Sequence, residues 1–249
     1  ISSLCDDNGN VVENEIELMN IMSGFYENLF KTKNISDADI QSYLNKLDIN
    51  TILSQKDKNM CDAQICEEEC YDALKQMKND KSPGIDGLQS EFFKCFWSDL
   101  KTYFMDNLNE IYQVGELSTS MKRAIICLIF KKGDRQLLKN YRPISLTNTD
   151  YKIIAFVLAS RMQKVIYKLV SPDQTAYIKK RFIGTNIRLL CDIFDYTECY
   201  NVPGAFVFLD FEKAFDSVEW NFLYKTLEKF GFGNNFIKWI KILYTNPEF

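Results

Sequence analysis

The residue with the clearest chemical potential is Asp210, a carboxylate near the end of the apolar run of residues 205–211. This run predicts a buried strand, and a charge at the end of such a strand is costly unless a partner compensates it. Mg²⁺ is such a partner, because it prefers carboxylate and phosphate oxygens, and a pair of these ions can catalyse phosphoryl transfer. The alternative is that Asp210 only caps the turn into the next helix.

Composition excludes many other chemistries. The chain has 249 residues and no histidine, which excludes Ser-His-Asp and Cys-His nucleophile systems, HExxH zinc sites and imidazole acid–base catalysis. Eight cysteines are too few for a disulfide scaffold at this length. Cys61, Cys66 and Cys70 are irregularly spaced, so we expect buried or idle thiols there rather than a zinc site.

Charge is distributed unevenly along the chain. The net charge of −4 argues by itself against a polyanionic partner. However, residues 121–188 carry 15 basic and three acidic side chains, whereas residues 1–120 carry 10 and 22. Tyrosine and phenylalanine are interleaved with these cations, which is typical of segments that bind a phosphate backbone. The alternative is a solvated cationic face.

Five motifs resemble those of reverse transcriptases. The segment AFVFLDFEKAFDSV (205–218) resembles the first catalytic palm motif of that family. The finger motifs are matched by KSPGIDG (81–87), IFKKGD (129–134) and NYRPISL (140–146), and the following block by QTAYIKKRFIG (174–184). The Ser-Pro-Gly-x-Asp-Gly and Tyr-Arg-Pro-Ile-Ser forms are most similar to non-LTR (LINE-type) retrotransposon enzymes, with group II intron maturases as the nearest relatives.

The resemblance implies roles for residues of the palm motif. Asp210 matches the first catalytic, metal-binding aspartate, and the backbone carbonyl of Phe211 matches a second ligand to the same pair of Mg²⁺ ions. Phe215 matches the aromatic gate beneath the incoming sugar, which leaves no room for a 2′-OH and so favours deoxynucleotides. Glu212 and Asp216 are expected to be structural.

The resemblance also implies a dNTP-binding and a template-binding group. Arg142 matches the finger arginine that grips the triphosphate through its guanidinium fork, and Lys131 or Lys132 would supply an accompanying charge. The template-binding positions are matched by Gln174, Lys179, Lys180 and Arg181. For these cations alone, a solvated loop is the alternative.

The loop of residues 81–87 is the strongest turn signal in the chain. Gly84 and Gly87 are expected to permit a conformation that a Cβ would forbid. Asp86 is expected to hold the turn through an Asx-type hydrogen bond rather than to do chemistry.

These residues must be positioned by a helix-rich α+β fold. The pattern of apolar residues predicts helices over 15–31, 67–77, 88–97, 99–113, 149–169, 185–197, 219–230 and 234–244. Strands are expected over 124–130, 141–146 and 205–211, and short polar pieces over 35–60. The resemblance implies the right-hand fingers and palm of a polymerase, truncated before the palm is complete.

The expected domain organisation has three parts: an N-terminal helical extension (1–65), the fingers (66–200) and the first part of the palm (201–249). The C-terminal palm, with its paired aspartates, and the thumb are expected to be missing from this chain.

The function implied is RNA-templated DNA synthesis by an RNA-directed DNA polymerase, with an RNA template, a DNA primer and dNTPs as partners. This chain alone is expected to be inactive. A non-catalytic RNA-binding module derived from a retroelement is the alternative, and a carboxylate-based hydrolase is more remote. We expect an intracellular protein, in the nucleus or cytoplasm, with no membrane-spanning segment.

Overall fold

The computed structural model describes residues 1–6, 8–49 and 51–248, so Phe249, the last residue of the predicted palm segment, lies outside the described residues. Its helices are α1 (Glu15–Phe30), α2 (Asp37–Lys46), α3 (Gln55–Asp62), α4 (Glu67–Gln76), α5 (Ser90–Cys95), α6 (Trp97–Val114), α7 (Thr119–Lys122), α8 (Thr149–Gln163), α9 (Ile166–Leu169), α10 (Ile183–Cys199), α11 (Trp220–Lys229) and α12 (Asn234–Tyr244). The strands are β1 (Leu4–Cys5), β2 (Val11–Val12), β3 (Ile125–Phe130) and β4 (Tyr141–Leu146), and the 3₁₀ helix η1 (Leu138–Asn140) precedes β4. In the part of the chain so described, no helix is long and apolar enough to cross a membrane.

Most predicted helices are confirmed, but residues 35–60 contain two helices that the sequence pattern did not predict. Both are short and polar, so they lack the apolar periodicity that marks a longer helix. Each begins with a serine cap: the Ser36 side chain accepts from the backbone N–H of Asp39, and the Ser54 side chain accepts from that of Asp57. This capping pattern is the signal that could have revealed α2 and α3.

The single helix predicted over residues 149–169 is divided into α8 and α9. At the break, the N–H of Lys164 donates to the carbonyl of Arg161 and that of Val165 to the carbonyl of Met162, as in a 3₁₀ turn. This turn allows Val165 and Leu169 to remain buried while the chain changes direction.

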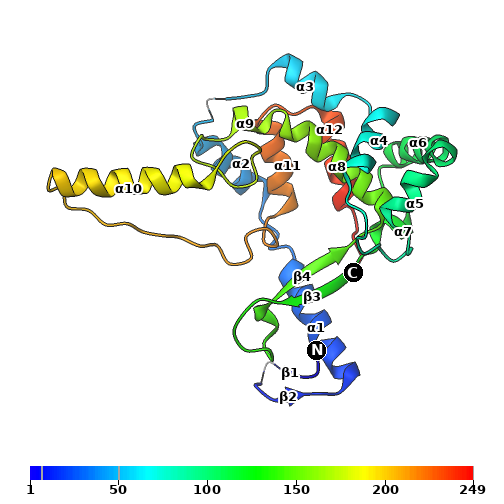
Figure 1. Ribbon diagram of the computed structural model, residues 1–249, viewed down its shortest axis with the longest axis horizontal. Coiled ribbons are helices and arrows are strands. Elements are labelled where there is room, and N and C mark those ends of the chain that lie inside the picture. The colour runs from blue at the N-terminus through cyan, green and yellow to red at the C-terminus, as the bar shows by residue number, and fades with distance from the viewer. Residues whose placement is uncertain (7, 50, 249) are drawn as a thin grey trace.

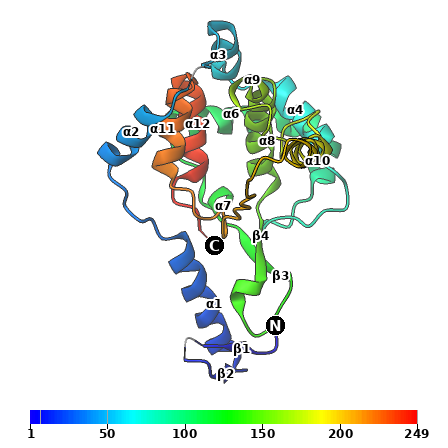
Figure 2. The same ribbon diagram turned by 90° about the vertical axis from the view of Figure 1, so that its left-hand side faces the viewer.

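Helix α8 lies at the centre of the helical body, in contact with α3, α4 and α12 (Figures 1 and 2). Its inner face carries fully buried aliphatic side chains, namely Ile153, Ile154, Val157 and Leu158. The core cluster around it extends from Leu53 to Leu243 and so includes residues from all three predicted domains. The domain boundaries therefore remain a prediction.

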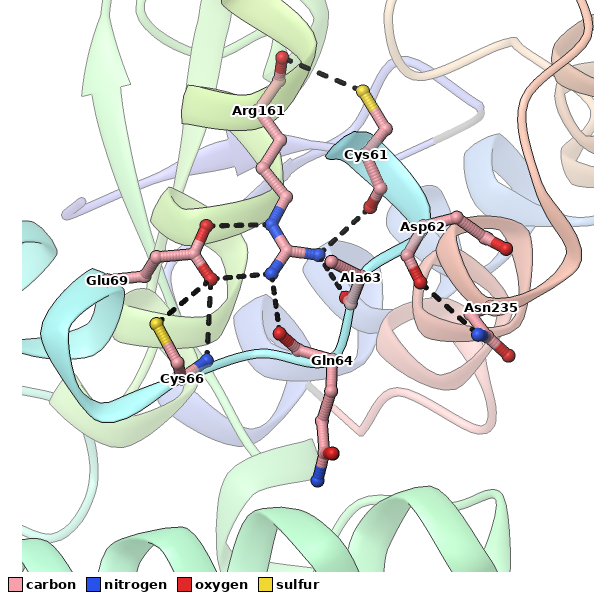
Figure 3. A network of polar contacts seen from close by, with 8 residues as sticks. All are labelled: Cys61, Asp62, Ala63, Gln64, Cys66, Glu69, Arg161 and Asn235. Atoms are coloured by element: carbon pink, nitrogen blue, oxygen red, sulfur yellow. Dashed lines mark hydrogen bonds and ion pairs between the residues drawn. The ribbon is translucent and has the colours of Figure 1, made fainter. Parts of the chain in front are cut away.

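A buried ion pair connects α8 to α4, and its arginine also binds the segment between α3 and α4 (Figure 3). The guanidinium of Arg161 donates from Nε to Oε1 of Glu69 at 2.8 Å and from its terminal nitrogens to Oε2 of Glu69 and to the carbonyls of Cys61, Ala63 and Gln64. All five of its N–H groups thus have acceptors, which is how a buried charge is tolerated. Nothing in the helical pattern of 149–169 distinguishes this arginine from a solvent-facing one.

The cysteines beside this ion pair are consistent with the expectation of buried or idle thiols. Cys61 and Cys70 are buried and Cys66 is exposed, and none forms a disulfide. Burial raises the pKa of Cys61 to about 11 and that of Cys70 to about 12, so both are neutral thiols at physiological pH.

A second, smaller cluster lies below the helical body, where α1 packs beside the β3–β4 hairpin (Figures 1 and 2). Leu4, Leu18 and Leu138 are its buried members. Leu4 comes from the β1–β2 hairpin, which the sequence pattern did not predict because each strand has two residues. The cluster joins the N-terminal residues to the loop that connects β3 to β4.

The predicted strand over residues 205–211 is wrong. Helix α10 has no buried residue and projects from the body, and the chain returns from its end as an extended connection to α11 (Figure 1). A strand needs a neighbour for its backbone groups, and in the described chain neither β-sheet extends to this segment. Leu209 is therefore 81% exposed instead of buried, and the contact with α10 is the stacking of Phe206 on Phe194, with ring centroids 4.2 Å apart.

Candidate nucleic-acid interface

The β3–β4 hairpin presents two different faces. The strands are antiparallel, and Ile129 lies opposite Arg142 while Phe130 lies opposite Tyr141. Ile129 and Arg142 are exposed, whereas Tyr141 is buried and donates from its hydroxyl to the carbonyl of Arg135 at 2.8 Å. The predicted triphosphate-binding arginine is therefore on the solvent face, close to the loop end of the hairpin.

The loop that joins the two strands is tightly organised. The N–H of Lys131 donates to the carbonyl of Asn140 at 2.9 Å, and the amide nitrogen of Asn140 donates to the carbonyl of Asp134 at 2.8 Å. Gly133 has φ of +92°, and a Cβ there would lie 2.8 Å from Nδ2 of Asn140, so the turn requires glycine. Lys131 and Lys132 are both exposed on this ordered loop, and the geometry favours neither as the phosphate ligand.

Ten of the 15 cations of residues 121–188 form no ion pair among the described residues, and five of those ten lie on this hairpin. Elsewhere in that range, five cations form ion pairs among the described residues: Lys122 with Glu116, Arg123 with Glu248, Arg161 with Glu69, Lys168 with Asp57 and Arg188 with Asp192. By contrast, no acidic partner within the described chain pairs with any of the hairpin cations, which are Lys131, Lys132, Arg135, Lys139 and Arg142. The loop end of the hairpin therefore carries uncompensated positive charge, which attracts polyanions.

The predicted template-binding loop is held together by Arg181. Its guanidinium donates to four backbone carbonyls, those of Tyr167, Val170, Ser171 and Gln174. The Gln163 side chain also donates to the carbonyl of Tyr177 at 3.0 Å. Lys179 and Lys180 remain exposed on this loop, so Arg181 organises the loop while the two lysines face solvent.

Phe215 and the template-binding loop come into contact. The ring of Phe215 is 76% exposed and meets the ring of Tyr177 edge-on, with centroids 5.6 Å apart. Asp210 and Phe211, in contrast, lie on the extended connection and are exposed. Among the described residues no hydrogen bond or ion pair joins Asp210 to Arg142, Lys131 or Lys132, so the structure does not bring the carboxylate and the hairpin cations into contact.

The described residues do not fit the expected pair of Mg²⁺ ions. Throughout residues 1–6, 8–49 and 51–248, no three cysteine, aspartate or glutamate side chains are grouped as a metal site would require. One carboxylate and one carbonyl, from Asp210 and Phe211, do not provide the oxygen ligands that two Mg²⁺ ions need.

The loop of residues 81–87 forms the predicted turn, and it packs against the start of α8, a contact that the sequence did not predict. A Cβ on Gly84 would lie 2.1 Å from Oδ1 of Asn148, and Gly87 has φ of +72°, so both positions require glycine. Asp86 accepts from the N–H of Leu88 at 3.0 Å, which confirms the Asx-type turn. The buried Asn148 also donates to the carbonyl of Ser120 at 3.0 Å, and so connects this loop to the segment before β3.

Part of the chain matches a known protein family. Residues 129–248 match the family described as "Reverse transcriptase (RNA-dependent DNA polymerase)".

The similar proteins come from transposable elements. The chain is 36% identical, over 248 residues that cover all of it, to the "Transposon TX1 uncharacterized 149 kDa protein" of Xenopus laevis. It is 25% identical over 217 residues, or 84% of its length, to the "Probable RNA-directed DNA polymerase from transposon BS" of Drosophila melanogaster. It is 28% identical over 174 residues, or 67% of its length, to the Pol polyprotein of the type-1 retrotransposable element R2 of Popillia japonica. The matched regions span 19%, 23% and 22% of these relatives, so the chain corresponds to about a fifth of each.

Proposed function

Because this chain belongs to the reverse transcriptase (RNA-dependent DNA polymerase) family of non-LTR retrotransposons, we propose that it takes part in RNA-templated DNA synthesis. Its partners are an RNA template, a DNA primer and dNTPs. The observation that carries the proposal is the ordered loop of the β3–β4 hairpin, which lies inside the matched residues 129–248 and presents exposed cations that form no ion pair among the described residues. Phosphate groups are the ligands that such a surface recognises best.

In this proposal, the hairpin belongs to the fingers of a right-hand polymerase. Arg142 and one of Lys131 and Lys132 bind the triphosphate of the incoming nucleotide, because the guanidinium offers two parallel donors and the ammonium a point charge. The exposed positions of these three side chains leave them free to do so. Gln174, Lys179 and Lys180 bind the template backbone, and Arg181 shapes their loop.

The palm portion supplies Phe215 and Asp210. Phe215 offers an exposed ring against which a deoxyribose fits and which gives a 2′-OH no hydrogen-bond partner. By the motif match, Asp210 and the carbonyl of Phe211 would supply oxygen ligands to Mg²⁺.

We further propose that this chain alone does not extend primers, because its described residues gather no metal site. The test compares single-nucleotide primer extension by this chain with extension by the longest polypeptide that its reading frame encodes. We expect extension by the longer protein and none by this chain.

An Asp210→Asn variant of the longer protein should lose extension while it retains RNA affinity, since only the carboxylate changes. A matched control is Glu212→Gln, which alters an exposed carboxylate of the same segment that has no assigned role in metal or substrate binding. Extension by the 249-residue chain, or full activity of Asp210→Asn, would contradict the proposal. RNA binding by a longer protein without any extension would favour a non-catalytic RNA-binding module instead.

A further inference from the structure

Helix α1 contacts both parts of the proposed nucleotide site. Along its first half it packs against the hairpin, where Leu18 is buried with Leu138 of the hairpin loop and Leu128 of β3 lies against the same cluster (Figure 2). Phe25, two turns further along α1, belongs to this cluster as well. The helix thus forms the support on which the inner face of the hairpin rests.

Strand β1 and the residue before it add polar contacts to the loop of the hairpin. The backbone N–H of Cys5 donates to the carbonyl of Gln136 at 2.8 Å, and the side-chain amide of Gln136 donates to Oγ of Ser3 at 3.4 Å. Gln136 lies in the loop that carries Lys131 and Lys132. The N-terminal residues therefore hold that loop from behind while its cations face outward.

The second half of α1 contacts the turn that carries Phe215. The ammonium of Lys213 lies 5.2 Å from the centroid of the Phe25 ring, a cation–π contact. The same turn is closed by hydrogen bonds to the carbonyl of Lys213 from the N–H of Asp216 at 3.0 Å and from the hydroxyl of Ser217 at 2.9 Å.

Glu219 attaches the segment that carries Phe215 at a second point, to two residues that follow α1 closely in the sequence. Its carboxylate accepts from the hydroxyl of Thr32 at 2.7 Å and from the N–H of Lys33 at 2.6 Å. Lys213 and Glu219 flank Phe215 in the sequence, so this segment is attached on one side to α1 and on the other to Thr32 and Lys33, which follow α1 closely.

We propose that α1 is a positioning element that sets the separation between the hairpin cations and Phe215, and thereby the discrimination against nucleotides with a 2′-OH. The inference rests on the proposed function. Phe25 is the central residue, because its side chain packs with the hairpin cluster and lies beneath Lys213. An α-helix rises 1.5 Å per residue and is stiff over this length, so a loosened contact at either end changes the separation.

The test measures KM and kcat for one dNTP and the matching rNTP, with the longest polypeptide that the reading frame encodes. Glu219→Ala removes both acceptors, and Phe25→Leu removes the ring face but keeps an apolar side chain. We expect each to raise the KM for the dNTP about threefold to tenfold, with kcat within about twofold, and to lower the preference for dNTP over rNTP.

Two further variants make the result specific. Glu219→Gln retains one acceptor oxygen and should restore much of the preference for dNTP. Glu27→Ala changes an exposed glutamate of α1 and should behave as the wild type.

Three outcomes would overturn the inference. One is wild-type KM and wild-type discrimination in both Glu219→Ala and Phe25→Leu. Another is a fall in kcat and melting temperature with unchanged discrimination, which would make the contacts merely structural. The last is a wild-type protein that extends no primer, which would refute the proposed function itself.

Discussion

The buried ion pair of Arg161 and Glu69 gives the sharpest prediction for stability. Replacing Arg161 with methionine removes all five donated hydrogen bonds and leaves the Glu69 carboxylate and three backbone carbonyls without that partner. Removing one member of a buried ion pair costs about 3–5 kcal/mol. The Arg161 side chain is 3% exposed but that of Glu69 is 30% exposed, so water can reach the carboxylate and we expect about 3 kcal/mol.

The effect should be measured by urea and thermal unfolding of this chain, followed by circular dichroism. A loss of about 3 kcal/mol is a large part of the roughly 5–15 kcal/mol typical of a domain, and lowers the melting temperature by about 6–12 °C. Arg188→Met is the matched control, because its ion pair with Asp192 is exposed, and it should leave the unfolding midpoint unchanged. A loss below about 1 kcal/mol for Arg161→Met would refute the reasoning.

The pH dependence provides a second check on the same pair. Burial alone would raise the pKa of Glu69, but the hydrogen bonds and charge of Arg161 more than offset it, so this pKa lies below its ordinary value of 4.5. A carboxylate with a lowered folded pKa contributes stability above its unfolded pKa and loses it as the pH falls through the folded pKa. Glu69→Gln should therefore be less stable than the wild type at pH 7, and the difference should shrink below about pH 4.5.

The remaining predictions concern the glycine contact and the template-binding lysines. Gly84→Ala should lower the melting temperature by several degrees, because its Cβ would clash with Asn148 at 2.1 Å. Gly24→Ala, in an open part of α1, should instead be neutral or stabilising by up to about 1 kcal/mol. Neutralising Lys179 and Lys180 together should reduce the slope of log K against log salt for RNA binding by about 1–2, measured by fluorescence anisotropy. An unchanged slope would exclude these two lysines from the template interface.

The elements that local signals determine could be predicted from the sequence. Helices α1, α4 and α6 follow their apolar periodicity, and the hairpin of β3 and β4 follows the tight turn at Gly133. The Asx turn at Asp86 was predictable because its hydrogen bond is between near neighbours. These features depend on few long-range contacts.

The features that depend on tertiary partners could not be predicted from the sequence. Residues 205–211 have the composition of a buried strand, but strand formation depends on a neighbouring strand, and none pairs with them in the described chain. The role of Arg161 depends on carbonyls about 100 residues away, which no local pattern reveals. The attachment of Phe215 to α1 likewise depends on contacts between distant segments.

The extended connection between α10 and α11 has a consequence for the covalent chain. Its residues 205–209 lie exposed and without hydrogen bonds to the rest of the described protein, so opening them for an incoming protease costs little free energy. Helices α11 and α12, by contrast, contribute Leu227, Phe236 and Trp239 to the core around α8. A single cut within the connection would therefore yield two pieces that remain associated through that core.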